Sequence, residues 1–380
     1  MIGLGIQLAI WSGRTIPTPS PLLADLFEEI KIESFEDKPS AFELRIRAGR
    51  SGPQSLLGYL PITLGSARAG NRIILTTAVN GIPRVLIDGV MTHVEMQPSE
   101  KPGAGRITIK GEDMTFYMTR KQVVKPYQKR TESNIVQEVL AKYIRFGMTA
   151  VVKLSKNETR GGLIDNFEMQ QRETDFEFLS RLAKHLGYVF FVEPGLAPGL
   201  STAYFGPPRT FGFGQPGMRA NMGAATNVNN ITVVDDPTMV KTESTKVLDP
   251  KTKRALPSRP FAIRPNLLAL FPTLVYARNL IRQELQDPSQ ASDFTRATAS
   301  ASGAQDLSAD KSIKLTGNLD TSRYGGVLRA RDTVKIGGVG IDYDGKYRVA
   351  QVTHNIREGS YTQNFTLARD GRFTNSGDIN

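Results

Sequence analysis

Apolar and charged residues alternate along short segments near both ends of the chain. Phe42, Leu44 and Ile46 are separated by single charged residues, so an extended strand here would have one apolar face and one wet face. Further strands are expected at 71–79, 84–87, 90–96, 106–110, 334–336, 346–353 and 363–368. Short strands separated by turn residues at this spacing are typical of an antiparallel barrel or sandwich.

Turn-forming dipeptides divide these runs. Asp88-Gly89 has the strongest tight-hairpin composition, and further turns are predicted at Asn80-Gly81, Asp344-Gly345 and Glu358-Gly359. The apolar residues 1–11 have no basic residue before them and no small-residue cleavage pattern after them. We therefore expect a buried first strand and no signal peptide.

Helical patterns dominate the middle of the chain. Ser133 is a candidate N-cap for a helix closed by Gly147, and Thr174 with Glu177 forms a capping box for a second helix closed by Gly187. Apolar residues recur at helical spacing in both segments. They are Ile135, Val136, Val139, Leu140, Tyr143 and Ile144 in the first, and Phe178, Leu179, Leu182, Ala183 and Leu186 in the second.

Strands, loops and one more helix are expected after residue 187. The segment 195–225 is rich in Gly and Pro, which favours loops. An amphipathic helix is predicted at 274–285, with Pro288 after it, and 289–310 has the composition of a surface linker or a weak helix. Strand-like runs lie at 188–192, 203–205, 230–234 and 239–244.

The chain is basic, with 48 Lys and Arg against 37 Asp and Glu and a net charge of +11. Such an excess invites a nucleic-acid-binding interpretation. The charges concentrate at 120–130 and 251–259, which we interpret as solvated connectors because neither stretch has the interleaved aromatic residues of a single-strand platform. Lys251, Lys253 and Arg254 could meet acidic partners, in which case charge reversal at these positions should weaken assembly.

No histidine or cysteine cluster suggests catalysis or metal binding. His93, His185 and His354 lie far apart and in no metal-ligand spacing, and the chain contains no cysteine. Structural roles are expected for all three histidines.

The carboxylate pairs and the glycine run are equally weak signals. Asp235-Asp236 and the pair Asp342 and Asp344 lie in turn-like sequence, and the glycine-rich run 337–340 precedes no helix. There is no Walker A pattern and no nucleophile elbow. We therefore assign no catalytic, cofactor-binding or metal-binding residue, and we expect neither a cofactor nor enzymatic activity.

Residues 170–192 carry a sharper pattern. A polar stretch leads into Phe-x-x-Arg-Leu, followed by a glycine and an aromatic strand, and the matching positions are Gln170, Glu173, Thr174, Asp175, Phe178, Arg181, Leu182, Gly187 and Phe190. This segment resembles late control protein D of contractile phages and the hub part of VgrG spike proteins. Residues 332–370, with Tyr-Asp-Gly-Lys-Tyr-Arg-Val and Val-Thr-His, resemble the end of the same family, and 85–113 is a weaker match.

The resemblance, which spans about residues 30 to 370, implies an α+β fold. It would contain two tail-tube-like antiparallel β-barrels with an intervening α/β region, assembled as a homotrimeric ring. The implied parts are a first barrel (1–120), an α/β domain (121–200), the first part of a second barrel (201–250), a helical insertion or linker (251–314) and the second part of that barrel (315–380). One face of each alternating strand would line the core, and the other the lumen or solvent.

The implied function is that of a structural baseplate hub in a contractile tail or injection system. The hub would join a hexameric tail tube to a trimeric spike, with a tail tube protein, a separate spike protein and other baseplate (wedge) proteins as partners and a tape measure protein as a further candidate. It would reside in the virion tail baseplate or in an injection particle assembled in the cytoplasm. Stable membrane insertion is not expected, because no segment has the roughly 20 consecutive apolar residues that a spanning helix needs.

Two other functions stay open at this point. A basic nucleic-acid-binding protein would show strongly salt-dependent binding. A tail-associated cell-wall hydrolase would need a carboxylate pair in a cleft. The hub pattern itself is shared by phage tails and the injection systems derived from them.

Overall fold

The computed structural model describes residues 6–14, 16–48, 59–101, 104–128, 130–153, 168–210, 214–248, 255–258, 260, 267–285 and 294–374. The helices are α1 (Pro21–Leu26), α2 (Leu60–Thr63), α3 (Glu132–Ala141), α4 (Asp175–His185), α5 (Thr273–Tyr276), α6 (Phe294–Ala309) and α7 (Thr321–Tyr324). The strands of the N-terminal half are β1 (Ile6–Gly13), β2 (Thr18–Pro19), β3 (Phe27–Phe35), β4 (Ala41–Arg47), β5 (Arg72–Val79), β6 (Ile82–Gln97), β7 (Arg106–Asp113), β8 (Gln122–Gln128), β9 (Met148–Val152), β10 (Glu168–Thr174) and β11 (Val189–Pro194). Those that follow are β12 (Ser201–Gly206), β13 (Met218–Arg219), β14 (Asn230–Asp235), β15 (Lys241–Leu248), β16 (Ala255–Ser258), β17 (Phe271–Pro272), β18 (Arg282–Leu285), β19 (Ile313–Asp320), β20 (Thr333–Gly337), β21 (Gly345–Arg357), β22 (Ser360–Arg369) and β23 (Gly371–Arg372).

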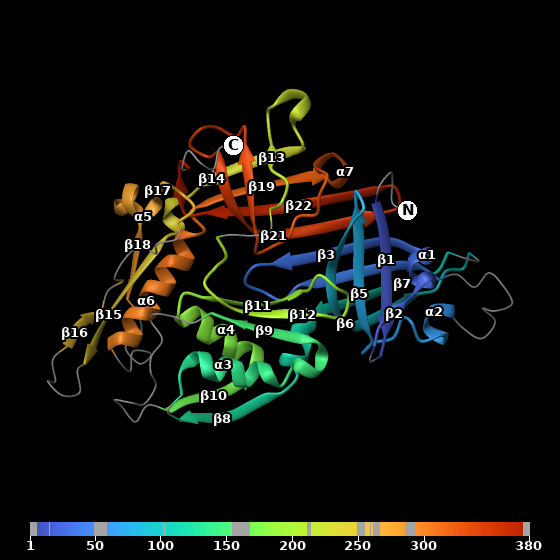
Figure 1. The fold of residues 1–380 in the computed structure, drawn as a ribbon, viewed down its shortest axis with the longest axis horizontal. Helices are drawn as coiled ribbons and strands as arrows, with labels where there is room; N and C mark the ends of the chain where they lie inside the picture. The colour runs from blue at the N-terminus through green and yellow to red at the C-terminus, as the bar shows by residue number, and fades with distance from the viewer. Residues whose placement is uncertain are drawn as a thin grey trace.

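One large sheet connects the beginning and the end of the chain. Its strands follow the order β14-β19-β22-β21-β3-β4-β7-β6-β5-β1-β2, and β13 and β20 extend it beside β21. β3 pairs antiparallel with β4 on one side and with β21 on the other, so strands from the first and last parts of the chain are direct neighbours (Figure 1). The predicted β-rich character of both ends is confirmed.

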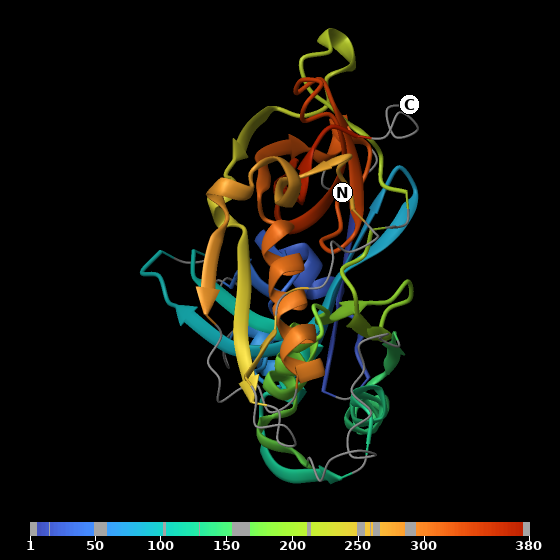
Figure 2. The same ribbon diagram turned by 90° about the vertical axis from the view of Figure 1, so that its left-hand side faces the viewer.

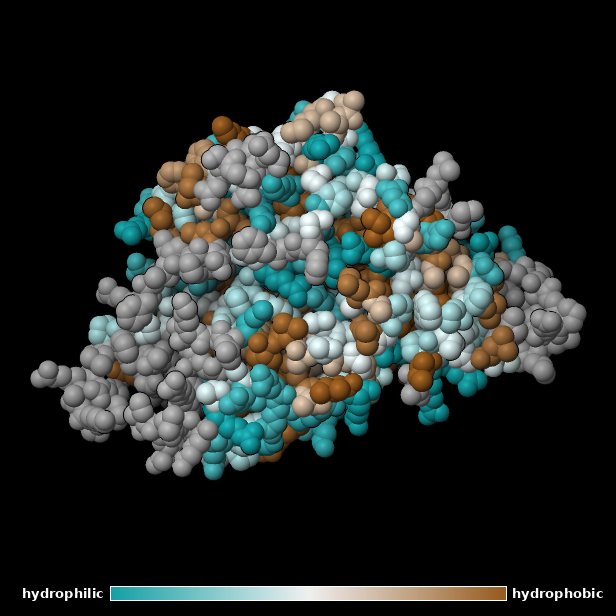
Figure 3. All heavy atoms as spheres, viewed as in Figure 1, coloured by the Kyte–Doolittle hydropathy of each residue, from teal (hydrophilic) through white to brown (hydrophobic). Residues whose placement is uncertain are grey.

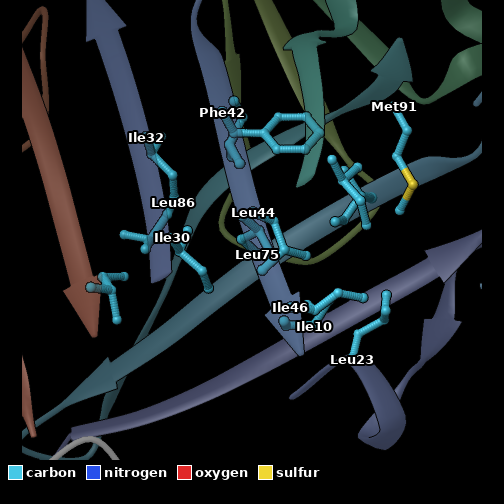
Figure 4. Close-up of a cluster of buried hydrophobic side chains, with 14 of the residues drawn as sticks. Ile10, Leu23, Ile30, Ile32, Phe42, Leu44, Ile46, Leu75, Leu86 and Met91 are labelled. Carbon is cyan, nitrogen blue, oxygen red and sulfur yellow. The ribbon is translucent and has the colours of Figure 1, made fainter. Parts of the chain in front are cut away.

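The first hydrophobic core lies between β3, β4 and β7 and the crossing strands β5, β6 and β1. Alternate residues of β3 and β4 point into it, and Figure 4 shows them facing side chains from the opposite layer. Burying each such side chain contributes about 1.5 to 3 kcal/mol. The central members, each at most 3% exposed, are Ile30, Ile32, Phe42, Leu44, Ile46, Ile73, Leu75, Ile107 and Ile109.

β6 runs without a break through the dipeptide that predicts a hairpin. The prediction of a turn at Asp88-Gly89 is therefore wrong, because Gly89 pairs with both β5 and β7. A Cβ atom on Gly89 would lie 2.2 Å from the Glu112 carbonyl oxygen, so this glycine permits close approach of a strand. The hairpin lies instead at Asn80-Gly81, where both residues have positive φ (52° and 78°), as a type I′ turn requires.

The α/β region forms a second core below this sheet in Figure 1. Both middle helices are present, and the Thr174–Glu177 capping box is present with Gly187 closing α4 at a φ of 68°. The first helix is shorter than predicted: α3 ends at Ala141, Gly147 closes a separate 3-10 turn at Ile144–Phe146, and Ile144 is exposed. The N-cap of α3, however, is Thr131 and not Ser133, because the Thr131 hydroxyl accepts the Asn134 N–H. The buried side chains include Ile135, Val136, Val139, Leu140, Phe178, Leu179, Leu182, Phe190 and Phe205.

Residues 120–130 are mostly a strand and not a connector. β8 pairs antiparallel with β10 along its whole length, so this basic stretch is one strand of a two-stranded sheet. Lys125 and Arg130 both form ion pairs with Glu138. In the second basic stretch, β16 pairs with β15, while Lys251, Lys253 and Arg254 lie outside the described residues.

The C-terminal strands enclose a third core. The turn at Glu358-Gly359 is confirmed, with a φ of 76° at the glycine. Asp344-Gly345 is not a two-residue turn, because β20 ends at Gly337 and β21 begins at Gly345, which leaves a loop of residues 338–344. The core side chains include Ile313, Leu315, Val334, Tyr347, Val349, Val352, Phe365 and Leu367.

The predicted amphipathic helix at 274–285 is wrong. The chain instead forms the short α5, a 3-10 turn at Arg278–Leu280 and strand β18, which pairs parallel with β15. The strand pairing satisfies the backbone, whereas Leu280 and Leu285 remain exposed, so the apolar stripe has no core against which a helix could pack. For 289–310, the described part is helix α6, which agrees with a weak helix and not with a linker; Pro288 lies outside the described residues.

Two glycines set the contact between α6 and the end of α4. A Cβ atom on Gly303 of α6 would lie 2.4 Å from the Gly187 nitrogen. The helix lies beside β15 (Figure 2) and also contacts β16, with Ala297 and Ala301 buried. Small residues thus allow α6 to contact the α/β region closely.

Replacing Gly303 by valine should weaken this contact. Overpacking costs about 1 to 3 kcal/mol, which exceeds the gain in helix propensity from glycine to valine, since even alanine gains only about 1 kcal/mol over glycine. We expect guanidinium unfolding to show lower stability and hydrogen exchange to speed up in α6. Gly214→Ala, where the added Cβ meets no atom within 4 Å, is the control, and equal effects of both substitutions would contradict the close-contact explanation.

Candidate functional site: a polar face of the main sheet

The central strands of the main sheet share one polar face. Glu43 of β4 lies opposite Lys110 of β7 and Lys31 of β3, and Lys31 lies opposite Asn355 of β21. Side chains paired in this way project from the same side of a sheet. Continued across the registers, this polar sheet face comprises His93, Glu95, Gln97, Arg106, Thr108, Lys110, Glu43, Arg45, Arg47, Glu29, Lys31, Glu33, Thr353, Asn355, Arg357, Ser360, Thr362 and Asn364.

Strands from both ends of the chain therefore build a single surface. The opposite sides of β3 and β4 fill the first core, so the alternation seen in the sequence separates a dry face from a wet one. A register slip of one residue would exchange the two faces, and burial of the apolar side prevents this.

Charges on the polar sheet face are paired across strands. Arg45 Nη1 lies 2.8 Å from Glu29, and Arg106 Nε lies 3.0 Å from Glu28. Exposed pairs of this kind contribute about 0 to 1 kcal/mol each, so their value to stability is small. One shallow depression of about 370 Å³ contains the residues that we call the arginine–glutamate cluster: Glu28, Glu29, Arg45, Arg47, Arg106, Arg357 and Glu358.

A buried ion pair attaches the α/β region to the main sheet. Arg72 contacts both carboxylate oxygens of Asp88, at 2.7 and 2.6 Å, and also donates to the carbonyls of Phe146 (3.1 Å) and Gly199 (2.9 Å). Burial raises the pKa of Asp88, and the bonds from Arg72 oppose that rise. This pair explains why Asp88 is not a turn residue.

Arg331 joins three parts of the chain. Its guanidinium donates to the carbonyls of Val192 (3.1 Å) and Lys38 (3.4 Å) and lies 4.4 Å from the centre of the Phe191 ring. Burial lowers the pKa of Arg331, and the nearby Asp113 carboxylate opposes this. Nothing in the sequence pattern indicated either junction arginine.

A cavity of about 860 Å³ separates α4 from the β15–β18 ribbon. One wall carries Arg181 and Lys184, and the other carries Glu243 and Glu284. Burial raises the pKa of Glu243, and the neighbouring Glu284 adds to the rise. The cavity contains no pairing of groups that resembles a catalytic arrangement among its described lining residues.

The three histidines occupy separate environments. His93 belongs to the polar sheet face, His185 lines the cavity at the end of α4, and His354 is buried on β21. The His354 Nδ1 atom lies 2.9 Å from the Tyr361 hydroxyl, and burial lowers the pKa of His354 to about 3. The imidazole is therefore neutral in the folded protein at ordinary pH.

The sequence-adjacent carboxylates hold turns and strand ends. Asp235 accepts from Arg372 (2.7 Å) and from the Tyr343 hydroxyl (3.2 Å). Asp236 accepts the Thr238 N–H at 3.0 Å, and Asp344 accepts a backbone N–H within its loop. Asp342 bonds through its backbone carbonyl to Phe373.

The described ranges of the chain contain neither a metal-ligand cluster nor a membrane-spanning helix. Within them, no group of three or more His, Asp or Glu residues could hold a metal ion. No helix in the same part of the chain is long and apolar enough to cross a membrane.

Burial of neutral His354 makes stability depend on pH. The unfolded chain binds a proton at His354 below about pH 6.5, whereas the folded chain does not until about pH 3. The stability contributed by neutral His354 is therefore present above pH 6.5 and lost as the pH falls towards 3, at up to about 1.4 kcal/mol per pH unit. Unfolding free energies of wild type and His354→Gln should converge on acidification, and a constant difference from pH 4 to 7 would refute this assignment.

Comparison with known proteins agrees with this architecture. Residues 33–199 match the family model described as phage tail baseplate hub (GPD). No curated protein sequence matches the chain.

Solved structures of tail proteins share the fold over nearly the whole chain. A tail protein from Neisseria meningitidis is 12% identical, with a TM-score of 0.63 over 97% of this chain and 98% of that one. The 43 kDa tail protein of prophage MuSo2 from Shewanella oneidensis is 14% identical, with a TM-score of 0.63 over 96% and 98% of the two chains.

A third similar structure comes from a secretion system. It is an Escherichia coli component of the type VI secretion system, 12% identical, with a TM-score of 0.53 over 92% of this chain and 76% of that one. The family resemblance noted in the sequence is thus confirmed: residues 33–199 carry the phage tail baseplate hub pattern, on a chain that has the fold of phage tail proteins.

Proposed function

We propose that this chain is the structural hub of a contractile tail or a related injection machine, where it joins a hexameric tail tube to a trimeric spike. The match of residues 33–199 to the baseplate hub family supports this most directly. The main sheet supports it independently, because a broad polar face built by both ends of the chain suits the wall of a wide channel.

In the proposed arrangement, three chains form a ring and each supplies two tube-like units. Three separate hydrophobic cores support the proposed division into 1–120, 121–200 and a second unit drawn from 201–250 and 315–380, with 251–314 as an insertion. Strands β3 and β21 connect the two units within each chain. Six such units would match a hexameric tube, and three chains would match a threefold spike.

Partner contacts are proposed at the end of the molecule that carries α5 and β17. Leu270, Phe271 and Val275 are each about half exposed there. Figure 3 shows apolar surface at the upper left, where Figure 1 places α5 and β17. Exposed apolar groups of this kind commonly mark interaction sites. We propose a separate spike protein, the tail tube protein, wedge proteins and a tape measure protein as the partners.

The proposed role is structural and not catalytic. The carboxylates that a hydrolase would need are committed to turns and strand ends, as at Asp236 and Asp344. We place the protein in a tail baseplate or an injection particle assembled in the cytoplasm.

Imaging the purified protein along its particle axis tests the proposal. We expect threefold rings with a pore and six similar lobes by single-particle electron microscopy. Because the chain has no cysteine, Asn364→Cys on the polar sheet face can carry a gold label, which should appear at the pore. Monomers at every concentration, or label at the outer rim, would contradict the hub arrangement.

A further inference from the structure

Four arginines on the polar sheet face lie close enough together to form a strong anion site. Arg106 and Arg47 are directly opposite each other on β7 and β4, an arrangement in which like charges repel. Arg45 and Arg357 project from the same face, and all four side chains line one shallow depression. Each is roughly half or more exposed, so solvent and solutes can reach the guanidinium groups.

A β-bulge places two consecutive glutamates among these arginines. The register between β3 and β4 skips Glu28, because Phe27 pairs with Ile46 while Glu29 pairs with Arg45. Successive residues of a regular strand point to opposite faces, and a bulge removes this restriction. Both glutamates therefore reach the polar sheet face.

Glu28 and Glu29 together contact all four arginines, and Glu43 also contacts Arg45 at 2.7 Å. Glu28 lies 3.0 Å from Arg106 and 4.0 Å from Arg47. Glu29 lies 2.8 Å from Arg45 Nη1 and 2.8 Å from Arg357 Nε. Glu358 adds a further contact at 3.7 Å from Arg47. The four arginines and the four glutamates that contact them leave a local charge near zero.

We propose that Glu28 and Glu29 mask a polyanion-binding site, so that a nucleic-acid chain can pass along the polar sheet face without being held there. Stability alone does not account for the arrangement, since exposed ion pairs contribute little. Phosphate groups bind arginine clusters strongly when no carboxylate competes for the guanidinium. The passage role rests on the proposed function, whereas the masking is a property of the isolated chain.

The charge-neutralised variant Glu28→Gln/Glu29→Gln tests the masking. Fluorescence titration with a labelled 20-nucleotide oligothymidine should show affinity raised about tenfold or more in low salt. The slope against log salt should be steeper by about 1.4, since two positive charges lose their carboxylates and each single-strand phosphate contact contributes about 0.7. Polyglutamate in a parallel titration distinguishes recognition of phosphate from attraction to any polyanion. Guanidinium unfolding should change little.

A matched control distinguishes the effect of the arginine–glutamate cluster from the effect of a change in net charge. Glu138 contacts Lys125 and Arg130, and Glu284 contacts Lys241 and Arg282, so each also bridges two cations. Glu138→Gln/Glu284→Gln changes the net charge equally and should leave the affinity and the salt slope nearly unchanged.

Three results would overturn the masking. They are tight binding by wild type with the same salt slope as the cluster variant, an equal gain in the control variant, and a cluster variant that loses stability without gaining affinity. If masking holds but no ring is found by imaging, the surface property stands and the hub arrangement fails.

Discussion

The antiparallel pairing of β3 with β21 is the contact on which the rest of the structure depends. It joins residues more than 300 positions apart in the chain, with Glu29 opposite Arg357 and Glu33 opposite Thr353. It also completes the first core, because Ile356 and Tyr361 pack among the N-terminal side chains. Without this pairing the main sheet would divide into two, with open edges at β3 and β21, and open edges favour uncontrolled association. The α/β region, the β15–β18 ribbon and α6 all lie between β3 and β21 in the sequence.

Buried arginines attach these segments to the main sheet. Arg72 and Arg331 each donate to backbone carbonyls of the α/β region, and Arg348 contacts Glu36 and Asp310, the latter at 3.0 Å. A guanidinium offers five donors in a fixed plane, so one side chain can satisfy carbonyls from several segments. Burying the charge is costly unless it is paired, which accounts for the carboxylates beside each of them.

Local signals predicted the elements better than their boundaries or contacts. The capping box at Thr174 and the alternation at 42–47 led to correct elements because each depends on neighbouring residues alone. Asp88-Gly89 misled because a long-range ion pair and a close strand overrode its turn propensity. The helix predicted at 274–285 failed because its partner is the edge of β15. The polar sheet face could not be predicted, because it depends on the register between strands, and no single segment of the sequence specifies that register.

This chain shares its fold with tail proteins of low sequence identity, because the alternating pattern of the strands constrains residue type only loosely. A strand with one buried face tolerates different apolar residues inside and different polar residues outside. Tail proteins that are only 12 to 14% identical to this chain can therefore share its fold. The segment around α4 is more demanding, since buried Gln171 accepts from the Tyr127 hydroxyl (3.0 Å) and donates to Asp175 (2.6 Å), which also accepts from the Tyr143 hydroxyl (2.7 Å). Such a network functions only when every member is satisfied. Asp175 is one of the positions that match the family pattern, so this network constrains at least one residue of that pattern, whereas the sheet is recognised by its shape.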